Sequence, residues 1–320
     1  MLQVPIMIQR QRQNNKLMVN ETINIASVEL SIRQKIDLVM ELTKFRITFF
    51  VTITTIFGYL CAAGDFSLQM IMPVAGILLL ACGSAVVNHY QERNTDALMK
   101  RTRNRPIPSG KIKAQDALNI AILLVITGST LLYLGGGVLA LGLGILNLVW
   151  YNGIYTPLKK INAFAIIPGS VVGAIPPAIG WVAAGGSLLD PRIAIISLFF
   201  FIWQIPHFWL LLLLFGEDYE QAGFPTLTQI FSVDQLGRIT FIWIITTVII
   251  GLTIPLFGVV RSELINYGLL ISGLWLCWKA VRLLRSTKEK KYFRFAFMEI
   301  NIFAILVVVL ISIDKLIILF

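Results

Sequence analysis

Three oxygen-bearing side chains recur every four residues in the stretch NHYQERNTD, residues 88–96. They are Asn88, Glu92 and Asp96, and we call them the acid stripe. A step of four residues turns an α-helix by only about 40° from its starting face, so the three side chains share one side of a helix. Two carboxylates and an amide oxygen form a hard-oxygen site of the kind that Mg²⁺ prefers when it also binds phosphate. The spacing therefore predicts a divalent-metal site.

A run of basic residues follows the acid stripe directly. Its members are Lys100, Arg101, Arg103 and Arg105. Ammonium and guanidinium groups donate hydrogen bonds to phosphate oxygens, so acids followed by cations predict a site for a metal-bridged diphosphate. The alternative is a charged loop whose acids pair with neighbouring arginines. The position of Asn88 and Glu92 favours a site, because both lie where an apolar run ends and polar groups are costly there unless used.

The composition shows in which medium these residues work. Of the 320 residues, 57% are hydrophobic and 14% are charged, and the mean hydropathy is +0.79. Soluble domains are usually nearer a quarter charged, whereas a bilayer core of ~30 Å takes about twenty apolar residues per helix. We therefore predict an all-α polytopic membrane protein with nine transmembrane helices around a central cavity capped by cytoplasmic loops. The predicted spans are 47–63, 70–90, 117–134, 136–154, 163–184, 193–214, 239–259, 264–284 and 296–313.

Lysine and arginine are distributed unequally between the predicted loops. Of 27 such residues, only Arg192, Arg261 and Lys315 fall on one side of the predicted membrane. The positive-inside rule then places the N-terminus in the cytoplasm and the C-terminus outside. The net charge of +10 would face anionic lipid rather than nucleic acid. We expect a bacterial inner (plasma) membrane, with the mitochondrial inner membrane as the alternative.

We divide the chain into an N-terminal cytoplasmic segment, 1–46, and a single transmembrane domain, 47–320. In the first, Ile32, Ile36, Val39 and Leu42 fall near one helical face. A helix with one apolar face and charges elsewhere is typical of a segment that lies at the membrane surface.

A second acidic segment, FGEDYEQAGFPT at 215–226, follows the sixth span and is expected to be a loop. Alone, Glu217, Asp218 and Glu220 would usually be solvated. Because this segment and the acid stripe are expected on the same membrane face, together they could hold two metals, or one metal and its diphosphate.

The stretch NHYQERNTDALMKRTRNRP resembles the first Asp-rich motif, N-x-x-x-D-x-x-x-D, of the UbiA-type intramembrane prenyltransferases. Its second half resembles M-x-R-T-x-x-R-P of the protoheme IX farnesyltransferase (heme O synthase) branch. ELTKFR, YTPLKK, PGSVVGAIPPAIGW, WQIPHFW and DYEQAGFP also fit that branch, and the matches cover residues 41 to 226 in order. Glu92 stands where Asp is usual, which keeps the charge and lengthens the reach. FPTLT replaces the more usual P-M-L-P.

The resemblance implies Mg²⁺-dependent transfer of a farnesyl group from farnesyl diphosphate to a vinyl group of heme b, which gives heme O. It implies that the acid stripe and Asp218 hold the metal and are catalytic. The implied diphosphate-binding residues are Lys100, Arg101, Arg103, Arg105 and Lys159. The product would pass to heme A synthase or a terminal oxidase.

Two histidines are present, His89 and His207. His207 lies in QIPHFW at lipid depth, where a lone histidine is either packed and hydrogen-bonded or, as the resemblance suggests, a heme-binding residue. His89 points about 100° away from Asn88 on a helix, so a structural or interfacial role is expected.

Two other functions stay open. A related prenyltransferase could act on an aromatic quinone precursor, although QIPHFW and DYEQAG disfavour it. A polytopic transporter should show inverted repeats and polar residues near the membrane centre, and the sequence shows no clear repeat.

Overall fold

The computed structural model describes residues 31–284 and 289–317, and every regular element in these ranges is helical. The predicted all-α class is confirmed. The chain forms two compact units, which meet in sequence between Val39 and Met40. In the first, α2 (Ile32–Leu42) begins with Ile32 and Ile36 exposed. The rest of the predicted N-terminal segment, residues 1–30, lies outside the described residues.

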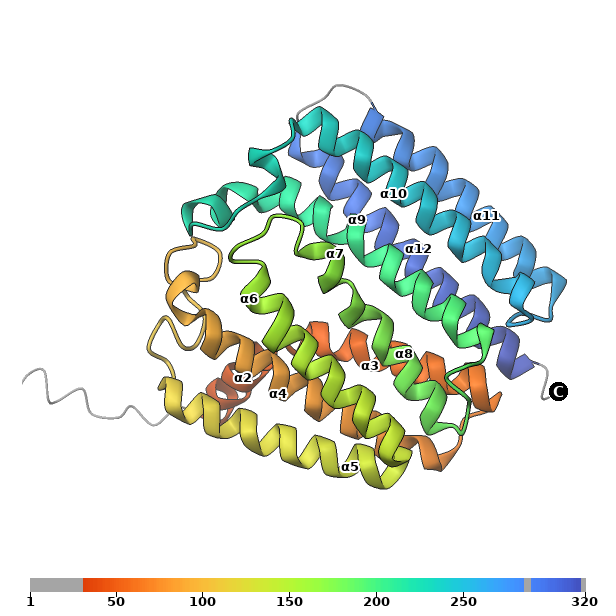
Figure 1. The fold of residues 1–320 in the computed structure, drawn as a ribbon, viewed down its shortest axis with the longest axis horizontal. Helices are drawn as coiled ribbons and strands as arrows, with labels where there is room; N and C mark the ends of the chain where they lie inside the picture. Colours follow the sequence, from red (N-terminus) through yellow and green to blue (C-terminus); the bar gives the residue numbers. More distant parts are fainter. Residues whose placement is uncertain (1–30, 285–288, 318–320) are drawn as a thin grey trace, which may run out of the picture. The chain divides into compact units, whose positions relative to one another are not determined.

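The helices of the second unit carry the candidate site. They are α3 (Phe45–Ala63), η1 (Leu68–Met70), α4 (Ile71–Asp96), α5 (Ala114–Val149), the π-helix η2 (Trp150–Tyr155), α6 (Thr156–Leu158), α7 (Ile166–Gly169), α8 (Val171–Ala183), α9 (Pro191–Gln221), η3 (Leu227–Gln229), α10 (Val233–Thr253), η4 (Ile254–Phe257), α11 (Glu263–Ala280), η5 (Val281–Leu284) and α12 (Lys290–Ile317). Neighbours in this arrangement include α3 with α8, α4 with α5, α8 with α9, and α9 with α10 and α12 (Figure 1).

Eight continuous helical stretches in the described chain are long and apolar enough to span a membrane, against nine predicted. The difference lies in one stretch, Ala114–Leu158, whose 45 residues would reach about 68 Å if straight, more than twice a bilayer core. It is not straight, because Gly137 has φ 75° and ψ −174° in its middle. A Cβ on Gly144 would lie 2.6 Å from Leu132, although residues twelve apart in a straight helix are about 18 Å apart. The chain therefore turns back at Gly137 (Figure 1), and the two predicted spans on either side are its two arms.

Close helix contacts hold the centre of this unit together. A Cβ added to Gly180 of α8 would lie 1.8 Å from the backbone oxygen of Thr55 in α3. A Cβ added to Gly58 of α3 would lie 1.9 Å from the backbone oxygen of Pro177 in α8. Small residues at such crossings let backbones pack directly, which is how membrane helices associate without a hydrophobic driving force.

Two helices run further than their apolar segments. The second predicted span ends at residue 90, yet α4 continues to Asp96, so the whole acid stripe is helical. The sixth ends at residue 214, yet α9 continues to Gln221. Glu217, Asp218 and Glu220 therefore lie on the last turns of a helix, and the prediction of a loop there was wrong. Hydropathy marks where a helix leaves lipid, whereas the backbone hydrogen bonds continue into the polar end.

Replacing Gly180 by valine should destabilise the α3–α8 crossing, because the new side chain has no space against the backbone of α3. We expect a loss of about 1–3 kcal/mol, typical of overpacking, measured as a lower unfolding temperature in detergent. Gly142→Val is the matched control, since a Cβ at Gly142 meets nothing within 4 Å. Equal unfolding temperatures for the two variants would contradict the close crossing.

Candidate active site

The acid stripe lies on the last turns of α4 and is shielded from solvent. Asn88, Glu92 and Asp96 are 0%, 4% and 0% exposed. Burying carboxylates is costly unless they are paired with cations or bind a metal. The stripe therefore needs positively charged partners from other parts of the chain.

Each member of the stripe has its own cation. Lys44 Nζ donates to Asn88 Oδ1 at 2.6 Å. Lys159 forms an ion pair with Glu92. Arg105 Nη1 lies 2.8 Å from both carboxylate oxygens of Asp96. We call Lys44, Arg105 and Lys159 the cation triad; they come from three separate segments, before α3, after α4 and after α6.

Lys44 is held in an unusual backbone conformation. It precedes α3 with φ 49° and ψ 44°, and it is the one non-glycine residue with positive φ in the described part of the chain. Such strain persists only where the surroundings impose it, often at functional sites. Burial of its ammonium, together with the neighbouring charge of Arg105, lowers the pKa of Lys44 to about 7. An anionic ligand beside it would raise that pKa again.

Lys159 has the opposite balance. Burial alone would lower the pKa of its ammonium, but the carboxylate of Glu92, assisted by nearby tyrosines, raises that pKa above its usual value. Lys159 is therefore charged at neutral pH. Its Nζ also lies 5.4 Å from the ring centre of Tyr155, a favourable position for a cation.

A π-helical turn positions the residues opposite the stripe. The π-helix η2 covers Trp150–Tyr155, and such turns are rare and frequent at functional sites. Just beyond it, Thr156 accepts a hydrogen bond from Asn88 Nδ2 at 3.1 Å and donates to the backbone oxygen of Tyr151 at 2.8 Å. The amide of Asn88 is thus oriented from both ends, with its oxygen toward Lys44.

A buried polar network ties η2 to α4. Ser84 Oγ donates to Asn152 Oδ1 at 2.6 Å, and Asn152 Nδ2 donates to the backbone oxygen of Ser84 at 3.0 Å. Gln91 Nε2 donates to the backbone oxygen of Asn152 at 2.9 Å. These bonds fix the register of η2 against α4, and with it the place of Thr156 and Lys159.

The second acidic segment lies near the stripe, as expected from a shared membrane face. Arg101 donates to the hydroxyl of Tyr219 at 3.1 Å, and Lys159 Nζ lies 6.0 Å from the ring centre of Phe224. Asp218 is half-buried, and its carboxylate forms no hydrogen bond or ion pair with the rest of the described chain. It is therefore available to a ligand, and its assignment as a metal ligand stays a prediction.

The departure FPTLT has a structural counterpart. Thr226 and Thr228 both donate to Glu220 Oε1, at 2.7 and 2.6 Å. Glu220 thus accepts hydrogen bonds from the turn after α9, whereas Asp218 accepts none from that turn.

The structure brings together only part of the predicted diphosphate set. Arg105 and Lys159 contact the stripe, and Arg101 reaches the second acidic segment. Lys100 and Arg103 are exposed, and no contact joins them to the stripe within the described residues. Sequence reasoning missed Lys44 and Thr156, although ELTKFR and YTPLKK contained them; their role depends on contacts across more than forty residues of sequence.

His207 faces α12 rather than the stripe. Its Nδ1 lies 2.8 Å from Asn301 Oδ1, while Asn301 Nδ2 donates to the backbone oxygen of Phe297 at 2.6 Å. Since Asn301 thereby presents its oxygen, His207 Nδ1 carries the proton and Nε2 keeps its lone pair. The ring centres of Trp203 and Phe297 lie 4.9 and 4.7 Å from the centre of the His207 imidazole. His207 is therefore both hydrogen-bonded and able to accept at Nε2, while His89 is buried.

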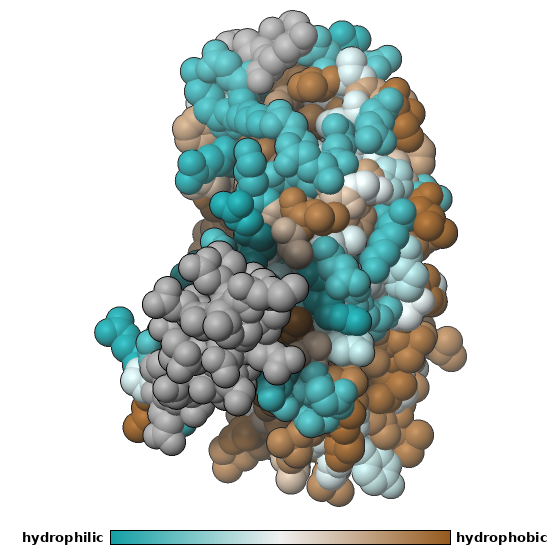
Figure 2. Space-filling view, turned by 90° about the vertical axis from the view of Figure 1, so that its left-hand side faces the viewer, coloured by the Kyte–Doolittle hydropathy of each residue, from teal (hydrophilic) through white to brown (hydrophobic). Residues whose placement is uncertain are grey.

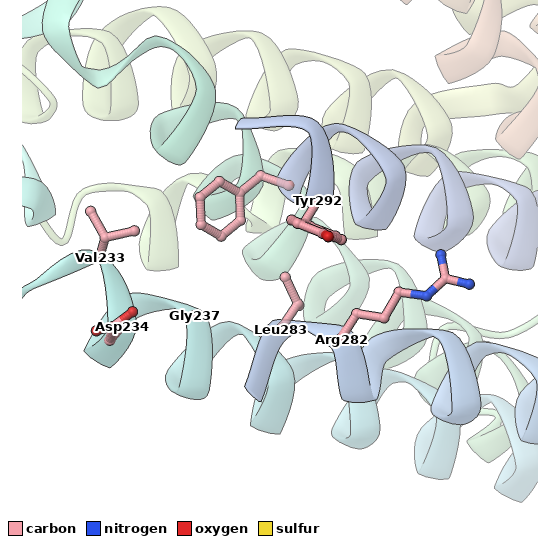
Figure 3. A pocket seen from close by; sticks show the side chains of 7 residues that line it. Val233, Asp234, Gly237, Arg282, Leu283 and Tyr292 are labelled. Carbon is pink, nitrogen blue, oxygen red and sulfur yellow. The ribbon is translucent and has the colours of Figure 1, made fainter. Parts of the chain in front are cut away.

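The polar residues of this unit gather at the end that carries the stripe. Figure 2 shows the end of the unit where α4 connects to α5 and α9 connects to α10. Hydrophilic residues cover much of this end. A separate small pocket, with a volume of about 10 Å³, is lined from α10, η5 and α12 by Val233, Asp234, Gly237, Arg282, Leu283, Tyr292 and Phe293 (Figure 3). None of its lining residues belongs to the stripe or the triad, so it is not the site of their chemistry.

The donor set fits a divalent metal and a phosphate ligand together. Two carboxylates and an amide oxygen share one buried face, and oxygen ligands of this kind suit Mg²⁺. Three cations stand at hydrogen-bond distance from them, within reach of any anion bound alongside.

Most of this chain matches one family model, and its relatives in sequence share one name. The family model described as UbiA prenyltransferase family matches residues 51–303. The protoheme IX farnesyltransferase of Oleidesulfovibrio alaskensis is 33% identical over 276 residues, or 86% of this chain and 95% of that relative. The protoheme IX farnesyltransferase of Geobacter sulfurreducens is 38% identical over 193 residues, or 60% of this chain and 70% of that relative.

Solved structures share the fold. A structure of digeranylgeranylglyceryl phosphate synthase has a TM-score of 0.72 at 17% identity. The match covers 88% of this chain and 99% of that one. A UbiA homologue from Archaeoglobus fulgidus bound to GPP and Mg²⁺ has a TM-score of 0.59 at 11% identity, with 86% and 99% covered. At such identities the likeness concerns the fold alone.

Removing one partner of a buried ion pair should cost far more than removing one partner of an exposed pair. We expect Lys159→Met to destabilise the protein by about 3 kcal/mol, because Glu92 is left charged and buried. Lys290→Met is the control, since Lys290 and Glu217 form a pair with side chains 60% and 78% exposed, worth at most about 1 kcal/mol. Unfolding of the detergent-solubilised protein in EDTA measures both.

The double variant Glu92→Gln/Lys159→Met completes the cycle. The free energy of unfolding that the double variant loses should be smaller than the sum of the losses in the two single variants, because no unpaired charge remains. Additive losses, or a Lys159→Met variant as mild as Lys290→Met, would contradict the pairing.

Proposed function

The chain belongs to the UbiA prenyltransferase family, and on that premise we propose that it transfers a farnesyl group from farnesyl diphosphate to a vinyl group of heme b, forming heme O. The observation that carries this proposal is the acid stripe with its cation triad, which offers a buried place for a metal and a diphosphate together. The names of relatives that match most of the chain support heme b as the acceptor.

The cation triad has two sets of partners in this proposal. Without ligand, Arg105 and Lys159 neutralise Asp96 and Glu92, and Lys44 donates a hydrogen bond to Asn88. Asn88, Glu92 and Asp96, with Asp218 as a further candidate, would hold Mg²⁺, which would supply Lewis-acid stabilisation of the diphosphate charge. The triad would then donate to the diphosphate oxygens instead of to the stripe, with Arg101 contributing from the edge, while Lys100 and Arg103 would attract the anion from the surface.

Bond cleavage follows from that arrangement. The farnesyl C–O bond breaks and the diphosphate leaves with the electron pair, which Lys44, Arg105 and Lys159 stabilise as charge develops. The ring of Tyr155 lies beside Lys159 at the same end, where its face can stabilise an allylic cation. The heme vinyl group then forms the new C–C bond, water adds the hydroxyl group, and one proton is released.

The acceptor would be held deeper, near His207. Its protonated Nδ1 is fixed by Asn301, and its free Nε2 suits heme iron or a porphyrin-orienting contact. Trp203 and Phe297 supply aromatic surface next to the imidazole.

We place the chain in a bacterial inner membrane, with the site on the cytoplasmic face and residues 47–320 as one prenyltransferase domain. The stripe lies at the end of the unit that gathers the basic loops, which supports this orientation. Heme O would leave toward heme A synthase or a terminal oxidase.

The acceptor assay tests this proposal directly. Purified protein with Mg²⁺ and farnesyl diphosphate should convert heme b and leave 4-hydroxybenzoate unchanged, as followed by mass spectrometry of the products. Asp96→Asn should lower turnover by about 10³-fold, because it removes a metal ligand and the partner of Arg105. Asp116→Asn, an exposed acid on α5, should retain turnover. Prenylated 4-hydroxybenzoate without prenylated heme would refute the proposal.

His207→Ala should weaken heme binding about tenfold or more and shift the heme absorption bands, since a nitrogen ligand is lost. Asn301→Leu should weaken binding less, because it frees the imidazole without removing it. If the heme spectra and the KM for heme b are unchanged in His207→Ala while its unfolding temperature falls, His207 has a packing role.

A further inference from the structure

A second charged pocket lies at the opposite ends of the helices that carry the diphosphate site. It is an open pocket with a volume of about 230 Å³, and it is lined by Cys61, Ala62, Ala63, Gly64, Asp65, Arg192, Arg261 and Lys315. The lining segments come from the end of α3, the start of α9, the loop before α11 and the last turns of α12.

The three cations of this pocket are Arg192, Arg261 and Lys315. They are the three that the charge distribution assigns to the outer face, out of 27 in the chain. They converge on one pocket from three segments far apart in the sequence.

Two carboxylates hold these cations in place. Asp190 accepts from Arg192 Nε at 3.0 Å, and the guanidinium lies 5.2 Å from the ring centre of Trp181. Asp314, which is buried, accepts from the backbone N–H groups of Arg261 and Ser262 at 3.1 and 2.8 Å. Its oxygens are thus directed at the backbone rather than at a side chain.

The remaining charges leave cationic capacity in the pocket. With Asp65, Asp190 and Asp314 counted, three carboxylates stand against the three cations. Within the described residues, however, the side chains of Arg261 and Lys315 form no ion pair, and Asp65 is exposed. The guanidinium of Arg261 and the ammonium of Lys315 are therefore available to an anion.

The pocket lies at the opposite end of α3 from the diphosphate site. The last turn of α3 lines the pocket, while Lys44, at the start of that 19-residue helix, belongs to the diphosphate site about 28 Å away. The turns next to the pocket carry large exposed apolar side chains, with Phe66, Leu189 and Leu256 60%, 94% and 81% exposed. Such side chains around a basic pocket suit an amphiphile with a charged head and apolar tails.

We propose that this pocket binds the phosphate of an anionic membrane lipid on the face opposite the diphosphate site. Arg261 and Lys315 donate to the phosphate, Arg192 forms the fixed wall, and the acyl chains run along the apolar rim. The distance from the acid stripe separates this site from the substrate site, so it binds a structural or regulatory lipid rather than farnesyl diphosphate.

The test compares two double variants of equal charge change. The full chain in a neutral detergent is titrated with phosphatidylglycerol, and the unfolding temperature is followed. We expect Arg261→Gln/Lys315→Gln to raise the half-saturating lipid fraction roughly 20-fold, since each cation near an anionic lipid contributes about a fivefold factor. Lys113→Gln/Arg238→Gln, two exposed cations at the other end, should change it less than about threefold.

Three controls sharpen the result. Lys315→Arg should retain lipid binding, because it keeps the charge. Turnover of Arg261→Gln/Lys315→Gln in detergent should equal that of the wild type, which shows that the variant folds. Inorganic phosphate should not reproduce the shift. Equal lipid responses in the two double variants would overturn the proposal, and saturation by inorganic phosphate with no further effect of lipid would overturn the assignment to a lipid.

Discussion

The arrangement of the site depends on the cost of burying two carboxylates at the end of a membrane helix. Glu92 and Asp96 are almost fully shielded from solvent, so hydration by water cannot stabilise their charges. Lys159 and Arg105 do so instead, and Lys44 occupies the corresponding place at Asn88. Because these cations come from three segments, the pairing fixes the ends of α3, α4 and α6 relative to one another. The same pairing keeps the stripe ready for a metal and the cations ready for a diphosphate.

Much of this could be predicted from the sequence. The helical class followed from composition, and the shared face of Asn88, Glu92 and Asp96 followed from a four-residue spacing that holds wherever the backbone is helical. The separation of the predicted spans 117–134 and 136–154 also followed from the sequence, and Gly137 adopts a positive φ where the chain turns back between them. These features depend on local geometry.

The partners in the site depend on contacts across the fold, which no spacing encodes. Lys44 contacts Asn88 across 44 residues, and Thr156 contacts it across 68. The π-helical turn that sets Thr156 and Lys159 has no simple sequence pattern. Hydropathy also placed Glu217 and Asp218 in a loop, because it reports where lipid ends and not where backbone hydrogen bonding ends.

The central claim is that the cation triad exchanges the acid stripe for a diphosphate when the metal binds. Calorimetric titration of Mg²⁺ with and without a non-hydrolysable farnesyl diphosphate analogue tests it most directly. Exchange predicts reciprocal coupling, with each ligand binding roughly tenfold or more tightly when the other is present. Mg²⁺ binding that is equally tight with and without the analogue would contradict the claim, since the triad would then not be shared between the two partners.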